Sequence, residues 1–157
     1  MSMSLNCRQF SRIASISVAL FVLILSSHTP LALAGSPAPP VVIVNPSVDV
    51  DFFSDGDLWA IFGVHYRAWP DGSAVKVFVL PDKHPVHRSF AIKRLHTYPY
   101  QLKRVWKRLA FSGTGRAPYI VKDQQEMLLK VSSTPGAIGY VDADFDTGES
   151  HVLIVTP

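Results

Sequence analysis

The fold is decided by two adjoining segments, VKVFVL at Val75–Leu80 and PDKHPVHRS at Pro81–Ser89. The first is an apolar run broken only by a lysine, which predicts a strand covered on both faces. The second predicts a tight turn and the start of a helix that continues to about His96. In an α/β sheet, unpaired N–H groups and the positive end of the helix dipole meet at such a junction, where anions bind. The candidate ligand contacts are His84, His87, Arg88 and Ser89.

The segments around this junction alternate between strand and helix. Val41–Asn45 is a short apolar run that predicts a first strand, and Ser54 with Asp57 forms a capping pair that predicts a helix start. Further helices are expected from Tyr98-Pro99 and from Asp123, and further strands at Ala117–Val121, Ala137–Val141 and His151–Val155. We expect the acidic segment Asp142–Ser150 to join the last two strands as a hairpin. The order favours a single α/β domain with a mixed sheet and helices on both faces.

The N-terminal region is typical of a secretory signal peptide. Arg8 and Arg12 precede the apolar run Ile13–Leu25, and Ala32-Leu33-Ala34 places small residues where cleavage occurs. The alternative is an uncleaved anchor helix, for which this apolar run is short. We expect residues 1–34 to be removed, residues 35–40 to be a Pro-rich tether, and residues 41–157 to be one periplasmic domain that does not span the membrane.

The charge balance changes when the signal peptide is removed. The chain has 15 Lys and Arg against 12 Asp and Glu, and loss of Arg8 and Arg12 leaves 13 against 12, a formal charge of +1. So small a charge, together with secretion, argues against nucleic-acid binding. The single cysteine, Cys7, lies in the same segment, so the mature protein is expected to have no disulfide and no thiolate chemistry.

The sequence offers little for catalysis or for a metal. It contains no His-Glu-x-x-His motif and no phosphate-binding loop. It also contains no nucleophile and base at a spacing typical of a catalytic motif. His84 and His87 could share a helix face, but two ligands are too few for a tight metal site. We therefore expect a protein that is not an enzyme, with no metal and no cofactor.

The helix expected from Tyr98-Pro99 has one apolar and one basic face. The apolar positions are Leu102, Val105, Trp106 and Leu109, and the basic positions are Lys103, Arg104, Lys107 and Arg108. The first spacing predicts a stripe that faces the core. The basic face is either an ordinary solvated surface or a surface for an acidic partner or anionic lipid.

Several segments resemble phosphate-type periplasmic solute-binding proteins. Asp57–Gly63 (DLWAIFG), followed by Trp69–Gly72 (WPDG), resembles a helix and turn of that family, and Thr134–Val141 (TPGAIGYV) is similar to its most recognisable strand. Trp106 and the Phe111–Pro118 loop resemble a shorter branch of the same superfamily.

The resemblance implies one lobe of a type 2 periplasmic-binding-protein fold. It implies a non-catalytic solute-binding protein, an accessory or substrate-binding component of a phosphate or other anion ABC transport or sensing system. The expected partners are a small anion and a membrane permease or sensor protein. In the family, a Ser-Gly-Thr at the helix start contributes to the oxyanion site, and Pro81–Ser89 has none. The alternative function is a ligand-free interaction module that docks an envelope partner through its basic helix.

The signal-peptide assignment predicts a mature protein that begins at Gly35. Intact-mass analysis of a periplasmic extract should find this species in the soluble fraction. A species that retains Met1 in the membrane fraction would mean that residues 13–25 anchor the protein.

Overall fold

The computed structural model describes residues 38–157 except 51, 114–115, 149, 151 and 156–157. The expected signal peptide, residues 1–34, and the first part of the expected tether lie outside the described residues. Among the residues that are described, no helix is both long enough and apolar enough to cross a membrane.

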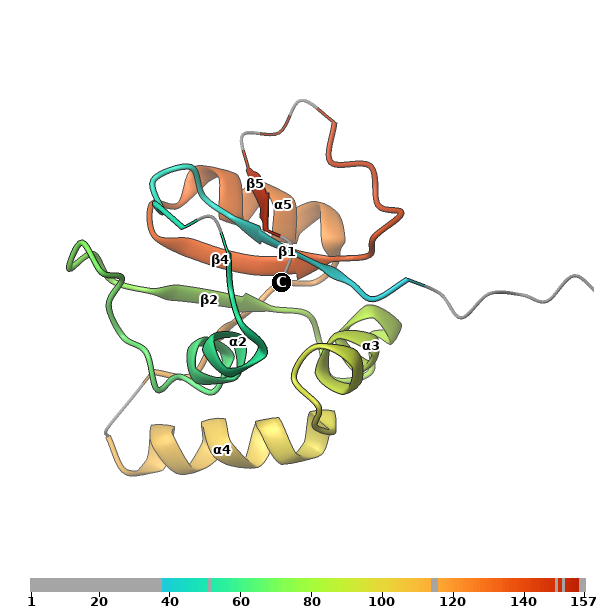
Figure 1. The fold of residues 1–157 in the computed structure, drawn as a ribbon. Coiled ribbons are helices and arrows are strands. Elements are labelled where there is room, and N and C mark those ends of the chain that lie inside the picture. Colours follow the sequence, from blue (N-terminus) through green and yellow to red (C-terminus); the bar gives the residue numbers. More distant parts are fainter. Residues whose placement is uncertain (1–37, 51, 114–115, 149, 151, 156–157) are drawn as a thin grey trace, which may run out of the picture. The chain divides into compact units, whose positions relative to one another are not determined.

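Five strands form a mixed sheet in the order β3-β2-β4-β1-β5 (Figure 1). The elements are, in chain order, β1 (Val41–Val44), α2 (Asp55–Phe62), β2 (Lys76–Val79), α3 (Pro85–Lys93), α4 (Pro99–Phe111), β3 (Tyr119–Ile120), α5 (Gln124–Ser133), β4 (Ala137–Val141) and β5 (Leu153–Val155). Strand β2 is parallel to β3 and β4, whereas β1 is antiparallel to β4 and β5. The expected α/β class and mixed sheet are confirmed.

Helices cover both faces of the sheet. Figure 1 shows α5 on one face and α2, α3 and α4 on the other. Neighbouring residues of β4 follow this division, because side chains alternate along a strand. Gly139 lies against Met127 of α5, while the ring of Tyr140 packs against Phe62 of α2 and Phe90 of α3. The core therefore consists of two layers that meet at the central strands.

The expected hairpin between the last two strands is wrong. Strand β1 lies between β4 and β5, with Val42 paired to Tyr140 on one side and to Val155 on the other. Hairpin loops are usually two to five residues long, and the connection Asp142–Ser150 is longer. Since Val42, Ile43 and Val44 are fully buried, β1 gains from a hydrogen-bonded partner on both edges.

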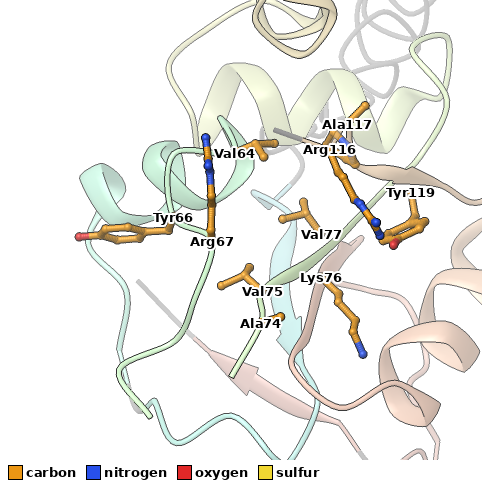
Figure 2. A pocket seen from close by; sticks show the side chains of 11 residues that line it. Val64, Tyr66, Arg67, Ala74, Val75, Lys76, Val77, Arg116, Ala117 and Tyr119 are labelled. Atoms are coloured by element: carbon orange, nitrogen blue, oxygen red, sulfur yellow. The ribbon is translucent and has the colours of Figure 1, made fainter. Parts of the chain in front are cut away.

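The connection from α2 to β2 folds back along the start of the strand (Figure 2). The Val75 N–H donates to the carbonyl of Arg67 at 3.0 Å, and Ala68 forms a bridge with Ala74. Val64, which follows the helix, has a φ of 60°. This left-handed conformation is strained for a β-branched residue.

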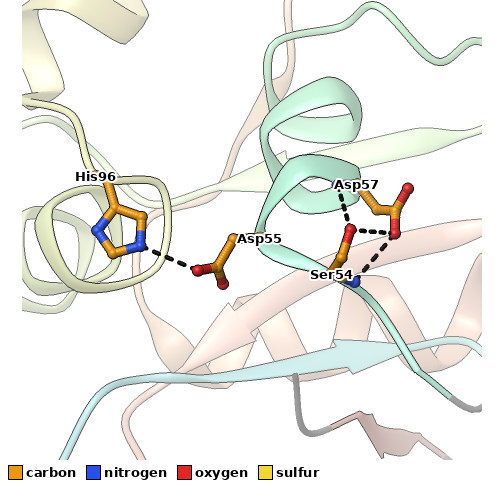
Figure 3. A network of polar contacts seen from close by, with 4 residues as sticks. All are labelled: Ser54, Asp55, Asp57 and His96. Atoms are coloured by element: carbon orange, nitrogen blue, oxygen red, sulfur yellow. Dashed lines mark hydrogen bonds and ion pairs between the residues drawn. The ribbon is translucent and has the colours of Figure 1, made fainter.

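The expected start of the first helix is confirmed. The Ser54 Oγ accepts the Asp57 N–H at 3.2 Å, and an Asp57 carboxylate oxygen accepts the Ser54 N–H at 3.0 Å (Figure 3). This is a capping box. In the same view, Asp55 forms an ion pair with His96 at 3.0 Å.

Helix α3 ends earlier than the sequence predicts. Its last residue is Lys93, and the chain then turns so that His96 has a φ of 49°. A residue with positive φ cannot continue a right-handed helix. The turn carries the chain from α3 to the start of α4.

Gly139 gives the most direct test of the packing between α5 and the sheet. A Cβ at this position would lie 2.5 Å from the Met127 Sδ and 3.0 Å from the Val131 Cγ2. We expect Gly139→Ala to lower the free energy of unfolding by about 1–3 kcal/mol in urea denaturation, because overpacking displaces the helix.

Gly56→Ala is the matched control. A Cβ there meets only the Ser54 Oγ at 3.6 Å, so stability should be unchanged or slightly raised. If Gly139→Ala is as stable as the native protein, α5 does not pack on β4 as described.

Candidate functional site

The junction between β2 and α3 is a closed turn. The Leu80 N–H donates to the Oη of Tyr140 at 3.0 Å, and the His84 N–H donates to the carbonyl of Pro81 at 2.8 Å. Both amides therefore have partners within the protein. The turn is fixed to β4 through the tyrosine hydroxyl.

His84 occupies the N-cap of α3. Its Nδ1 accepts the Val86 N–H at 3.3 Å, and the residue between them, Pro85, has no N–H. Helix starts bind anions through unpaired amide groups. Here a proline and a capping imidazole reduce the number of such groups, so an anion would have to displace the imidazole or use the remaining amides.

His87 points into the core rather than toward this site. Its side chain is 0% exposed, and its Nδ1 lies 2.5 Å from the Oη of Tyr140. The Nε2 is buried and has no hydrogen-bond partner in the described part of the chain. His87 is spaced three and four residues from the buried Phe90 and Ala91, so a helix pattern of i, i+3, i+4 was the signal that placed it in the core.

The remaining predicted ligand contacts are accessible. Arg88 is exposed and Ser89 is partly exposed, both in the first half of α3. His84 and Arg88 are four residues apart and share one side of the helix. The structure therefore brings His84 and Arg88 together on the surface and separates His87 from them. The anion-binding role of these residues stays a prediction.

Burial determines the protonation states of His87 and Tyr140. It lowers the pKa of His87 below its ordinary value of 6.5, a shift that nearby His84 increases and Asp82 opposes. Burial also raises the pKa of Tyr140. The pair is therefore uncharged at neutral pH. His87 therefore adds no positive charge to the start of α3 at neutral pH.

The carboxyl ends of the three parallel strands carry acidic groups. Asp82 follows β2, Asp123 follows β3 and Asp142 follows β4. Asp82 forms an ion pair with Lys103 of α4, and Asp123 caps α5 by accepting the Glu126 N–H at 2.8 Å. This edge of the sheet therefore offers an anion a mixed rather than a strongly positive potential.

The basic face of α4 lies on the surface, as its spacing predicts. Its members Lys103, Arg104, Lys107 and Arg108 are all exposed. Within the described residues only Lys103 of the four takes part in an ion pair. A role for this face in docking a partner stays a prediction.

Comparison with known proteins identifies the fold through structure alone. No protein-family model matches the chain, and no curated protein sequence matches it. PstS from Borrelia burgdorferi has a TM-score of 0.54 and 15% identity, covering 75% of this chain and 46% of that one. An ABC-type phosphate transport receptor from Vibrio cholerae has a TM-score of 0.49 and 12% identity, covering 74% of this chain and 45% of that one.

The chain therefore spans less than half the length of these two structures. The likeness to PstS, together with the mixed sheet and its two helical layers, confirms the expected fold class. The fold is an α/β domain that is similar to part of the PstS structure.

The buried histidine predicts a specific dependence of stability on pH. In the unfolded chain His87 takes up a proton near pH 6.5, whereas the folded protein resists this because burial lowers the pKa. Unfolding therefore binds a proton below pH 6.5, and the free energy of unfolding falls as pH is lowered, by up to about 1.4 kcal/mol per pH unit. Above pH 6.5 this residue contributes no slope.

Urea denaturation of His87→Gln at several pH values checks this. In this variant, the free energy of unfolding should decline less below pH 6.5 than it does in the native protein. The exposed His65→Gln should keep the native dependence of this free energy on pH. Equal slopes for the native protein and His87→Gln would contradict a buried neutral imidazole.

Proposed function

We propose that this chain is a non-catalytic solute-binding lobe, an accessory or substrate-binding component of an anion transport or sensing system. The observation that carries the proposal is the likeness of its fold to PstS over 75% of the chain. The sequence blocks that resemble phosphate-type solute-binding proteins support it. The protein would work in the periplasm after removal of residues 1–34, with a membrane permease or sensor protein as its partner.

The blocks that carry the sequence resemblance contact each other. The Trp69 Nε1–H donates to the carbonyl of Gly136 at 3.0 Å, and the Lys76 N–H donates to the same carbonyl at 3.0 Å. Gly136 has a φ of 75°, and a Cβ there would collide with the carbonyl oxygen of Ala74. These contacts fix the start of β2 against the start of β4, which supports a shared architecture.

The proposed anion site is the exposed start of α3. Arg88 supplies a forked donor, Ser89 a hydroxyl and His84 an imidazole at the cap. Asp82 lies in the same turn, and its negative charge opposes binding, although Lys103 offsets it. An open site with these groups binds an oxyanion weakly, and salt screens it strongly.

We expect phosphate, sulfate and small carboxylates to bind with dissociation constants in the millimolar range. Arg88→Gln should weaken binding about fivefold, because one exposed charge-assisted contact is lost. Arg104→Gln, which removes a charge from α4, is the matched control and should change nothing. Calorimetry and the amide shifts of α3 are the measurements.

Two results would count against the proposal. Micromolar phosphate binding by the monomer would show a closed site that the described residues do not provide. Amide shifts that cluster on residues 103–108 would favour the docking module, with its contact surface on the basic face of α4.

A further inference from the structure

The residues at the start of β2, the end away from α3, line a cavity. This cavity of about 330 Å³ opens beside the first residues of β2 and β3. It is lined by Val64, Tyr66, Arg67, Ala74, Val75, Lys76, Val77, Arg116, Ala117, Pro118 and Tyr119. Because β2 and β3 are parallel, both strands begin at this edge of the sheet, which we call the amino edge. Helix α3 begins at the carboxyl edge, where these strands end.

The floor of the cavity is apolar. Figure 2 shows Val64, Val75 and Val77 gathered between Arg67 and Arg116. Val77 is buried, and the other two valines are partly exposed. Such a surface favours an apolar group of a ligand over water.

The cavity is held open by backbone contacts. The Val75 N–H donates to the Arg67 carbonyl, and the amides of His65 and Tyr66 donate to the carbonyl of Ala60 at 2.8 and 3.1 Å. These bonds hold Val64 in its left-handed conformation beside the cavity. Strained residues of this kind persist where surrounding contacts fix them, and they cluster at binding sites.

The charged groups around the cavity are all cationic. Its lining includes Arg67, Lys76 and Arg116 and no Asp or Glu. Within the described chain, none of these three cations takes part in an ion pair. The Asp71 carboxylate, in the turn before β2, accepts both the N–H and the Oγ–H of Ser73. An anion that enters here therefore meets two or three uncompensated positive charges.

The two arginines are the main candidates for charge recognition. Figure 2 shows them on opposite sides of the valines, with Arg116 running toward Tyr119 and Lys76 pointing away from the floor. Lys76 also borders a neighbouring hollow that contains Glu126. It therefore adds to the local potential and makes no direct contact in this arrangement.

We propose that this cavity binds a small organic anion, with an apolar body on the valine floor and a phosphate or carboxylate held by Arg67 and Arg116. The volume lies at the lower end of the range for small-molecule sites. Guanidinium groups pair with both kinds of anion. The site is separate from the start of α3, so it does not depend on the function proposed there.

Phenyl phosphate is the probe. Inorganic phosphate and phenol are the comparison ligands, because they carry its charged part and its apolar part separately. In NMR titrations of the purified full chain, phenyl phosphate should shift the amides of Val75–Val77 and Arg116–Tyr119. Each comparison ligand should bind at least about tenfold more weakly at these amides, because neither satisfies both the floor and the cations.

Variants separate the contributions of charge and of the apolar floor. Arg67→Gln and Arg116→Gln should each raise the dissociation constant about fivefold, and Val75→Thr should also weaken phenyl phosphate. Both arginines are exposed, so these variants should keep the native fold. Lys122→Gln is the matched control, since it removes an exposed charge at the other edge of the sheet and should leave this binding unchanged.

Three outcomes would overturn the proposal. Equal shifts with inorganic phosphate and phenyl phosphate would reduce the cavity to a charged surface. Shifts confined to α3 would place all binding at the other edge. No saturable response up to about 10 mM phenyl phosphate would show that the cavity has no such ligand. Failure of Arg88→Gln to weaken inorganic phosphate would count only against the site on α3.

Discussion

The position of Tyr140 in the sheet holds the rest of the fold together. Its ring stacks on Phe90 at a centroid distance of 3.9 Å and meets Phe62 edge-on at 5.7 Å. Its hydroxyl accepts the Leu80 N–H and shares a short hydrogen bond with His87. One side chain of β4 thus fixes α2, α3 and the end of β2. A phenylalanine here would keep the packing but would leave two buried polar groups without partners, which is costly.

The sequence predicted those features that depend on neighbouring residues. Apolar runs located the central strands, and the pair Ser54 and Asp57 located the start of α2, because both signals lie within a few positions. Strand order was missed where it depends on distant partners. Nothing near Asp142–Ser150 indicates that β1 inserts between β4 and β5, since that pairing is set by residues about 100 positions away.

The candidate sites also combine features that depend on neighbouring residues with features that depend on distant ones. His87 was predicted to contact a ligand, yet it falls in the core because of the apolar positions that follow it. The cavity at the amino edge had no sequence signal at all. Its arginines, Arg67 and Arg116, are far apart in the chain. The backbone contact of Arg67 with Val75 and the parallel pairing of β2 with β3 bring them together.

The resemblance to solute-binding proteins also acquires a physical meaning. Trp69 and Gly136 are recognisable because they contact each other and cannot be replaced freely: one needs an indole N–H, the other a positive φ and no Cβ. Such residues preserve the packing of β2 against β4 and specify no ligand. Acidic residues follow the parallel strands at one end of β2, and cations lie before them at the other end. A sheet with this charge distribution attracts an anion more strongly to its amino edge, and α3 must overcome the field of the acidic residues at its own edge.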